Sequence, residues 1–209
     1  MFFEFVLYCI SDPANGDPSR LAAEVARRDV DFFQFRHKSL PDDERLRMAL
    51  EVAAVPRPST RLLIHGNMEL ARRTFADGIH LSAGTMSIEA ARRELPGKCV
   101  GVSVHSLGEA VEAAAHRPDY LLLAPVFAPI SKGAYRTPLG LKGLREVCEA
   151  VSVPVIALGG MTIERFAEVL ENGAAGVAGI TLFADLAALE RVTEQFRAAS
   201  KARRQPARD

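Results

Sequence analysis

The chain has 209 residues, 48% of them hydrophobic, which is enough to bury the core of one globular domain, or of two. Lysine plus arginine and aspartate plus glutamate both number 26, so the formal net charge is zero. This balance argues against nucleic acid or an acidic membrane surface as the partner, and any site for an anion must be local.

The predicted elements begin with an apolar run that is too short for a membrane span and has no basic segment before it. Strands are predicted at 5–10, 30–35, 62–65, 78–81, 100–104, 120–124, 155–158 and 176–180. Helices are predicted at 18–28, 41–55, 68–75, 87–95, 106–116, 141–150, 163–171 and 185–199. The cysteines, Cys9, Cys99 and Cys148, have no CxxC spacing, so we expect reduced thiols in a cytoplasmic protein.

This alternation of strands and helices predicts a parallel sheet with right-handed crossovers. The simplest arrangement of such units is a single (β/α)₈ barrel, a TIM barrel, over residues 1–200. Residues 201–209 are rich in basic side chains and are predicted to be a disordered tail. An open, doubly wound sheet is the alternative, but no GxGxxG motif follows the first strand. The sequence leaves the oligomeric state open, and a homo-oligomer is one option.

The last two predicted strands both stop at glycine. One leads into Gly159 and Gly160, and the other ends with Gly179, Ile180 and Thr181. Backbone N–H groups approach an anion closely only where no Cβ intervenes, and barrels of this kind commonly hold a phosphate after strands seven and eight. We therefore predict a phosphate cradle here. The simpler alternative is that these glycines only permit tight turns.

The second predicted strand ends with alternating polar residues, Gln34, Arg36 and Lys38. Alternate side chains of a strand share a face, so all three are expected to point the same way. Two cations and an amide on one face suit a phosphate or a pyrophosphate. They could instead be ordinary surface residues, but unpaired cations on the inner side of a strand end are costly, which favours an anionic ligand.

Two histidines end predicted strands and are therefore candidates to reach a pocket at the strand ends. These are His65, after the third strand, and His105, after the fifth. An imidazole that exchanges a proton near pH 7 suits acid–base chemistry, although a lone histidine is more often structural. The long connection 125–140, which carries Ser131 and Lys132, is a candidate lid over the pocket or else an ordinary surface insertion.

Together these segments resemble the thiamine phosphate synthase/TenI family of small (β/α)₈ barrels. The resemblance extends from the first strand to the last helix, and the order and spacing of its segments are specific. The segments are 34–38 (QFRHK), 77–81 (DGIHL), 101–106 (GVSVHS), 119–127 and 159–160. It implies a protein of thiamine biosynthesis that binds a small-molecule phosphate.

The synthases of this family join a thiazole phosphate to a pyrimidine pyrophosphate and release pyrophosphate, which requires cations around the departing charge. By resemblance, three groups of residues contact the substrates. They are Gln34, Arg36 and Lys38 for the pyrimidine pyrophosphate, Ser103, Ser131 and Lys132 as further polar contacts, and Gly160 and Thr181 for the thiazole phosphate.

The chain departs from both branches of the family at positions that bear on the activity. The synthases carry an Asn-Asp pair after strand three, whose Asp helps to hold Mg²⁺, and a second metal-holding Asp after strand four. This chain has His65-Gly66 and Thr85 at these positions. Asp77 lies at the wrong end of the fourth strand to substitute. We therefore expect no metal or other cofactor, with Mg²⁺ needed only by a synthase. The TenI branch lacks that metal site, but its histidine after strand six is Pro125 here.

On this basis we expect a metal-independent thiazole tautomerase, an isomerase that relocates a proton with His65 or His105 as its acid or base. A thiamine phosphate synthase with a rebuilt metal site is the alternative. A second alternative is a non-catalytic protein that binds a thiazole phosphate or acts as a regulator, because the cradle glycines are present while both catalytic patterns are incomplete.

Overall fold

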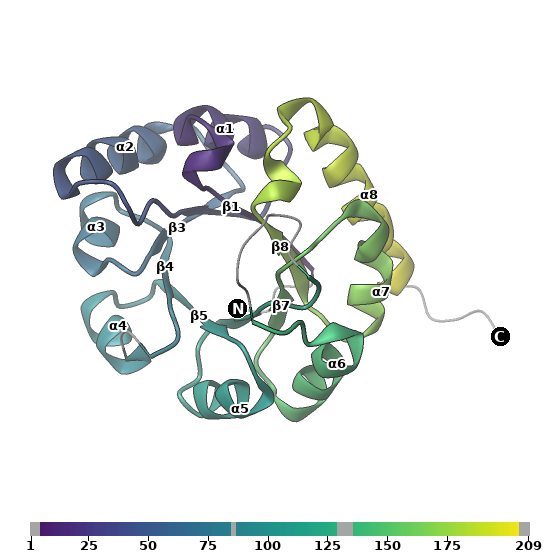
Figure 1. Cartoon of the computed structure of the whole chain (residues 1–209). Coiled ribbons are helices and arrows are strands. Elements are labelled where there is room, and N and C mark those ends of the chain that lie inside the picture. The colour runs from purple at the N-terminus through teal and green to yellow at the C-terminus, as the bar shows by residue number, and fades with distance from the viewer. Residues whose placement is uncertain (1–4, 85–86, 129–135, 205–209) are drawn as a thin grey trace.

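The structure, a computed structural model, describes residues 5–84, 87–128 and 136–204. Eight parallel strands close into a barrel in sequence order, and β8 returns to pair with β1 (Figure 1). The α-helices form a ring outside the strands. The predicted (β/α)₈ barrel is therefore confirmed, and the open sheet is excluded.

The strands and helices lie close to their predicted ranges. The strands are β1 (Val6–Ile10), β2 (Phe32–Phe35), β3 (Arg61–His65), β4 (Gly78–Leu81), β5 (Cys99–Val104), β6 (Tyr120–Leu123), β7 (Val155–Ala157) and β8 (Gly176–Gly179). The α-helices are α1 (Pro18–Ala26), α2 (Asp42–Ala54), α3 (Met68–Arg73), α4 (Ile88–Glu94), α5 (Leu107–Ala115), α6 (Gly140–Ala150), α7 (Phe166–Glu171) and α8 (Leu189–Arg204). The connections contain the short 3₁₀ helices η1 (Pro13–Asn15), η2 (Ile163–Arg165), η3 (Thr181–Phe183) and η4 (Leu186–Ala188).

The predicted tail begins too early, because residues 201–204 form the last turn of α8. The run 189–204 contains no glycine or proline, and its alanines, lysine and arginines favour a helix. Near this end Ser200 is buried, and its hydroxyl donates to the carbonyl of Phe196 at 2.8 Å. Residues 205–209 lie outside the described part of the chain.

The core has two layers, one between the strands and the helices and one inside the barrel. Because side chains alternate along a strand, neighbours such as Tyr8 and Cys9 belong to different layers. The inner layer consists of Val6, Tyr8, Ile10, Phe32, Leu63, Cys99, Tyr120, Leu122, Ile156 and Ala178. The cysteines are free thiols, as predicted, and burial raises the pKa of Cys99 to about 12.

Three aspartates tie neighbouring strands together at the amino end of the barrel. Each precedes an even-numbered strand and donates its own N–H to the carbonyl of one residue in the preceding strand. The carboxylate of the aspartate then accepts the backbone N–H of that same residue. The side-chain bonds run from Leu7 to Asp31 (2.8 Å), from Leu62 to Asp77 (2.8 Å) and from Val100 to Asp119 (2.7 Å). Arg197, Arg57 and Arg92 pair with these three carboxylates in turn. Asp77 is therefore structural and far from the strand ends that carry the candidate site, as predicted.

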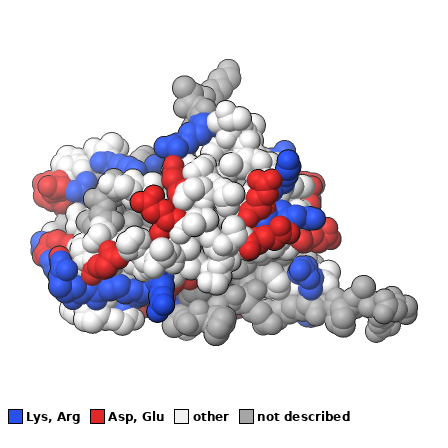
Figure 2. Space-filling view, turned by 90° about the horizontal axis from the view of Figure 1, so that it is seen from below, with Lys and Arg blue, Asp and Glu red and all other residues white. Residues whose placement is uncertain are grey.

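Acidic and basic side chains are interspersed on the face drawn in Figure 2, with no large area of one sign among the described residues. This distribution agrees with the zero net charge of the sequence. None of the helices within the described residues is long and apolar enough to cross a bilayer.

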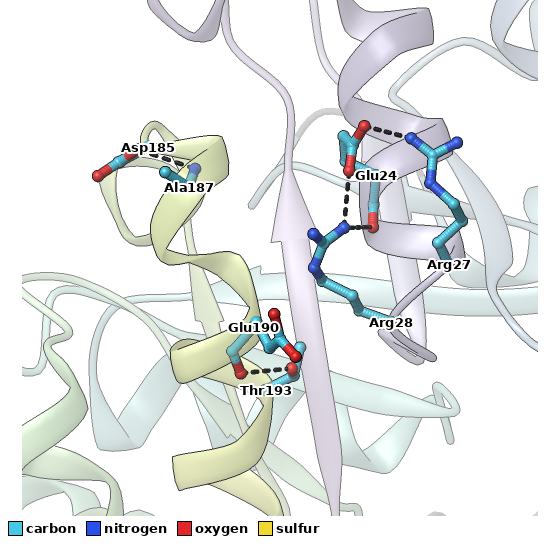
Figure 3. Close-up of polar contacts among 7 residues, drawn as sticks. All are labelled: Glu24, Arg27, Arg28, Asp185, Ala187, Glu190 and Thr193. Carbon is cyan, nitrogen blue, oxygen red and sulfur yellow. Dashed lines mark hydrogen bonds and ion pairs between the residues drawn. The ribbon is translucent and has the colours of Figure 1, made fainter.

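Short-range polar contacts fix α1 and the segment that returns from β8 (Figure 3). On α1, Glu24 pairs with both Arg27 and Arg28, contacts at the surface that contribute little to stability. Before α8, the carboxylate of Asp185 accepts the backbone N–H of Ala187 at 2.9 Å and so caps η4. This cap holds the chain just beyond the end of β8, where the phosphate cradle is predicted.

Candidate functional site

Several of the predicted site residues lie at the carboxyl ends of β2, β3 and β5. Two of them, Lys38 and His65, line a cavity of about 270 Å³ together with Ser82, which follows β4, and we call it the β2–β4 cavity. Its other lining residues are Phe35, His37, Arg45, Gly66, Asn67 and Leu70. The cavity is therefore bounded by two cations and two imidazoles, and no carboxylate is among the described residues that line it.

The two cations that follow β2 are held differently. The guanidinium of Arg36 pairs with Asp12, which follows β1, at 2.9 Å, and both side chains are about 30% exposed (30% and 27%). Lys38 has no ion-pair partner among the residues described. Burial, and then the charge of Arg36, lower the pKa of Lys38. An anionic ligand at this end would thus meet one cation already oriented by a carboxylate and a second one that is free to pair.

A chain of hydrogen bonds crosses the inside of the barrel from β2 to β5, and we call it the barrel ladder. The Gln34 amide nitrogen donates to the Tyr8 hydroxyl at 2.9 Å, and the hydroxyls of Tyr8 and Tyr120 are 3.0 Å apart. The Tyr120 hydroxyl lies 2.9 Å from Nδ1 of His80, whose Nε2 lies 2.8 Å from Oγ of Ser103. Two predicted substrate contacts, Gln34 and Ser103, are therefore the two ends of one buried polar chain.

Sequence reasoning did not give a site role to the three middle members of the ladder or to most residues of the cavity, His37 among them. Tyr8 and Tyr120 lie in strands whose other residues are apolar. The only signal in the sequence that their side chains point into the barrel is the alternation of side chains along a strand. His37 stacks on Phe35 with ring centres 4.8 Å apart, and its buried Nε2 has no hydrogen-bond partner in the described structure. Burial lowers the pKa of His37, so this nitrogen belongs to a neutral ring.

His65 lies in the pocket at the end of β3, where the sequence predicted it. Its Nε2 is 3.1 Å from Oγ of Ser82, its ring stacks on that of His80, and its buried Nδ1 has no partner among the described residues. Burial, followed by the charges of Lys38 and Arg36, lowers the pKa of His65 to about 4. The ring is therefore neutral at physiological pH and meets a ligand as a hydrogen-bonding group.

This depressed pKa predicts a loss of stability on acidification. Above pH 6.5 both the folded and the unfolded His65 are neutral, and as the pH falls towards 4 the unfolded chain takes up the proton first. The free energy of unfolding should fall over this window, by roughly 3 kcal/mol at most from His65. His65→Asn should flatten the dependence, as measured by urea denaturation between pH 4 and 7. An unchanged slope would contradict the assignment, and His116→Asn, a half-exposed histidine at the end of α5, is the matched control.

His105, the second predicted acid or base, is fixed away from the β2–β4 cavity. Its Nδ1 donates to the carbonyl of Ala124 at 2.6 Å, and its backbone N–H donates to Glu109 at 2.8 Å. A second cavity of about 510 Å³ lies between α4 and α5 and reaches the ladder at Ser103, and Arg136 is among its lining residues. His105 is not among the residues that line either cavity.

Close packing leaves no room for a side chain at the two glycines that follow β7. Gly159 and Gly160 have φ angles of +102° and +59°. A Cβ on Gly159 would lie 2.8 Å from Cα of Pro125, and one on Gly160 would lie 2.4 Å from the carbonyl oxygen of Ala128. The positive φ angles agree with the tight-turn alternative, and the close contact with the chain that leaves β6 is a second reason for glycine at both positions. The phosphate cradle remains a prediction.

The end of β8 lies beside these glycines, since β7 and β8 are paired. A Cβ on Gly179 would lie 2.7 Å from that of Leu182. Ile180 packs against the inner core layer, and its carbonyl accepts from the Asn15 side chain at 2.9 Å. Thr181 is exposed at the start of η3. Three further predicted positions, Ser131, Lys132 and Thr85, lie outside the described residues.

Gly160→Ala should both destabilise the protein and weaken thiazole phosphate binding if the cradle is formed here. The strained φ and the contact with Ala128 together predict a loss of about 1–3 kcal/mol, measured by urea denaturation, and a higher KM for thiazole phosphate. Gly97→Ala is the matched control, because Gly97 has a φ of +74° but no atom within 4 Å of the added Cβ. An unchanged KM would reduce Gly160 to a packing role, and equal stability losses would contradict the clash.

The described residues do not fit a Mg²⁺ site of the kind that the resembled synthases use. No group of three or more His, Cys, Asp and Glu side chains within the described ranges is placed to hold a metal ion. The β2–β4 cavity is lined by Lys38 and Arg45 instead of carboxylates. Because Mg²⁺ prefers anionic oxygen ligands, these side chains suit an anion and not a divalent cation.

The fold and the site define the class of protein: a (β/α)₈ barrel with a cationic, hydrogen-bonding site at the carboxyl ends of its strands, where barrel enzymes carry their chemistry. A family model described as "Thiamine monophosphate synthase" matches residues 7–183. The chain belongs to this family, as the sequence motifs predicted.

Individual relatives match over most of their length. The chain is 39% identical to the thiamine-phosphate synthase of Salinibacter ruber, over 90% of this chain and 82% of that protein. It is 36% identical to the thiamine-phosphate synthase of Methanoculleus marisnigri, over 94% and 97%. Among solved structures, thiamine phosphate pyrophosphorylase from Pyrococcus furiosus superposes with a TM-score of 0.84 at 28% identity, over 97% and 98%.

Proposed function

We propose that the protein is a thiamine-phosphate synthase, which joins a thiazole phosphate to a pyrimidine pyrophosphate and releases pyrophosphate. The observation that carries the proposal is the pair of cations after β2, Arg36 and Lys38, near a cavity that no described carboxylate lines. The names of the relatives at 36% and 39% identity, which match over most of their length, support the same activity. The proposal therefore replaces the tautomerase that the sequence alone favoured.

In this reaction the bond between the pyrimidine methylene carbon and a pyrophosphate oxygen breaks, and the thiazole nitrogen forms the new bond to that carbon. Negative charge grows on the departing pyrophosphate, and cations held in place beforehand stabilise it without reorganisation. Asp12 holds Arg36 in such a position, and Lys38 is available for a direct ion pair. Gln34 and Ser103, at the two ends of the barrel ladder, would orient the substrate at β2 and at β5.

The protonation state of His65 argues in the same direction. Relocating a proton is efficient when the acid or base has a pKa near the working pH. The pKa of His65 is lowered to about 4, which makes it a weak base and leaves almost no acid at neutral pH. The synthase reaction does not require His65 to gain or lose a proton, so a neutral His65 is compatible with it.

The test is a direct assay with both substrates. The purified protein is mixed with pyrimidine pyrophosphate and thiazole phosphate, once with Mg²⁺ and once with EDTA, and thiamine phosphate is measured by chromatography. We expect thiamine phosphate and an equal amount of pyrophosphate. No product under either condition would overturn the proposal. Isomerisation of a thiazole carboxylate phosphate, followed by NMR, would then identify the tautomerase, and binding of thiazole phosphate without turnover would identify the binder.

A further inference from the structure

The barrel ladder buries more polar groups than the barrel needs for its packing. Tyr8, Tyr120, Gln34 and His80 are all at most 1% exposed. Phenylalanine at either tyrosine position would fill nearly the same space without burying a hydroxyl, and buried polar groups are costly unless every one is hydrogen-bonded. The four hydrogen bonds of the ladder, of 2.8 to 3.0 Å, meet this condition along the whole chain from Gln34 to Ser103.

The direction of these hydrogen bonds follows from the Gln34 end. The amide nitrogen of Gln34 only donates, so the oxygen of Tyr8 accepts there and its proton is left for Tyr120. The hydroxyl of Tyr120 in turn donates to Nδ1 of His80. In the opposite direction the oxygen of Tyr8 would receive two donors, and its own proton would have no acceptor in the ladder.

One consequence is a fixed tautomer of His80. Its Nδ1 is an acceptor, so its Nε2 carries the proton and donates to Oγ of Ser103. Burial lowers the pKa of His80 well below its ordinary value, which keeps the ring neutral. His80 therefore does not accept the hydroxyl proton of Ser103, which can be donated to another acceptor, and Ser103 lines the cavity between α4 and α5.

We propose that Tyr8, Tyr120 and His80 are positioning residues that orient the Gln34 amide at one end and make Ser103 an obligate hydrogen-bond donor at the other. Ser103 would then select substrate groups that present an acceptor atom, such as a phosphate oxygen or an unprotonated ring nitrogen. The kinetic part of this inference rests on the proposed synthase function, whereas the tautomer of His80 does not.

The order of the ladder separates the effects of two variants. In Tyr120→Phe, Nδ1 of His80 loses its donor, so the fixed tautomer and the direction of the Ser103 proton should both be lost. In Tyr8→Phe, Tyr120 still donates to His80, so the tautomer should stay and only the Gln34 end should be released. Phe32→Leu is the packing control, because Phe32 contacts both tyrosine rings without belonging to the ladder.

The spectroscopic experiment is ¹⁵N NMR of histidine-labelled protein. We expect wild type, Tyr8→Phe and Phe32→Leu to show His80 as the Nε2–H tautomer, and Tyr120→Phe to show a mixture. A wild-type Nδ1–H tautomer, or a fixed tautomer that survives Tyr120→Phe, would overturn the proposal. This experiment needs no turnover, so it stands apart from the synthase assay.

The kinetic experiment is a double-mutant cycle. We expect Tyr120→Phe to lower kcat/KM about tenfold in wild type, the effect of one lost hydrogen bond, and to have no further effect in Ser103→Ala. Equal losses in both backgrounds would mean that Tyr120 does not act through Ser103 and would contradict the proposal. If the protein shows no synthase turnover, the same cycle is measured on the Kd of thiazole phosphate.

Discussion

Replacing Lys38 with methionine should lower kcat/KM for the pyrimidine pyrophosphate by about 10²- to 10³-fold, the range seen when one preorganised group that stabilises developing charge is removed. Lys38 is the cation lining the β2–β4 cavity that has no ion-pair partner among the described residues, whereas Arg36 is already paired with Asp12. Methionine keeps most of the length of the side chain, so the loss should come from the charge. Steady-state kinetics with pyrimidine pyrophosphate varied at saturating thiazole phosphate measures it.

The matched control for Lys38→Met is Lys142→Met, which removes a charge of the same kind from a side chain on α6 that is 92% exposed. This variant should keep wild-type kinetics. A loss of similar size in both variants would point to a general effect of net charge, and a wild-type kcat/KM in Lys38→Met would remove Lys38 from the proposed site. Either result would contradict the role given to the end of β2.

Replacing Gly101 with alanine should destabilise the protein by about 3 kcal/mol, at the upper end of the usual range for overpacking. A Cβ on Gly101 would lie 2.0 Å from Cζ of Tyr120. That ring cannot move aside easily, because it is fully buried against Tyr8 and Phe32. Since the hydroxyl of Tyr120 is part of the barrel ladder, kcat/KM should fall together with the free energy of unfolding, and urea denaturation and kinetics measure the two effects.

Gly108→Ala, on the neighbouring α5, serves as the control for Gly101→Ala. The nearest atom to a Cβ on Gly108 is 4.0 Å away, so the added methyl group meets ordinary space. Alanine favours the helix by about 0.5–1 kcal/mol over glycine, and this variant should be slightly more stable than wild type. If Gly101→Ala were equally harmless, Tyr120 would not be held as rigidly as its contacts indicate.

The alternation of apolar and polar residues along the sequence was sufficient to predict the barrel and to place the candidate residues at the strand ends. Short apolar segments that alternate with helical patterns predicted each strand to within two residues at either end. At the end of β2, alternate residues share a face, and the structure has Gln34 buried and Lys38 lining the cavity. These features depend on neighbouring residues only, so a single sequence contains them. The end of α8 was misjudged because basic residues resemble a frayed tail as much as a last helical turn.

The barrel ladder was beyond local reasoning, because Tyr8 and Tyr120 meet only when the sheet closes. Each lies in a short apolar strand, and no neighbouring residue indicates that the two hydroxyls meet. The same limit applies to Gly159, whose close neighbour Pro125 belongs to a different connection. For the function, His65 and Gly66 are a local departure from the synthase pattern, whereas the likeness to proteins named thiamine-phosphate synthase extends over most of the chain and favours the synthase alternative.

The aspartates at the amino end divide the barrel into pairs of strands that are not equally secured. Three pairs of strands are joined by both a backbone and a side-chain hydrogen bond from one aspartate. They are β1–β2 through Asp31, β3–β4 through Asp77 and β5–β6 through Asp119. In the fourth pair the corresponding residue is Ala175, which supplies only the backbone bond to Val155, and β7 has just three residues. Local opening should therefore require the least free energy at β7–β8. Gly159, Gly160 and Gly179, at the predicted phosphate cradle, would then belong to the pair of strands that opens most easily. Binding a phosphate there would stabilise the least stable part of the barrel.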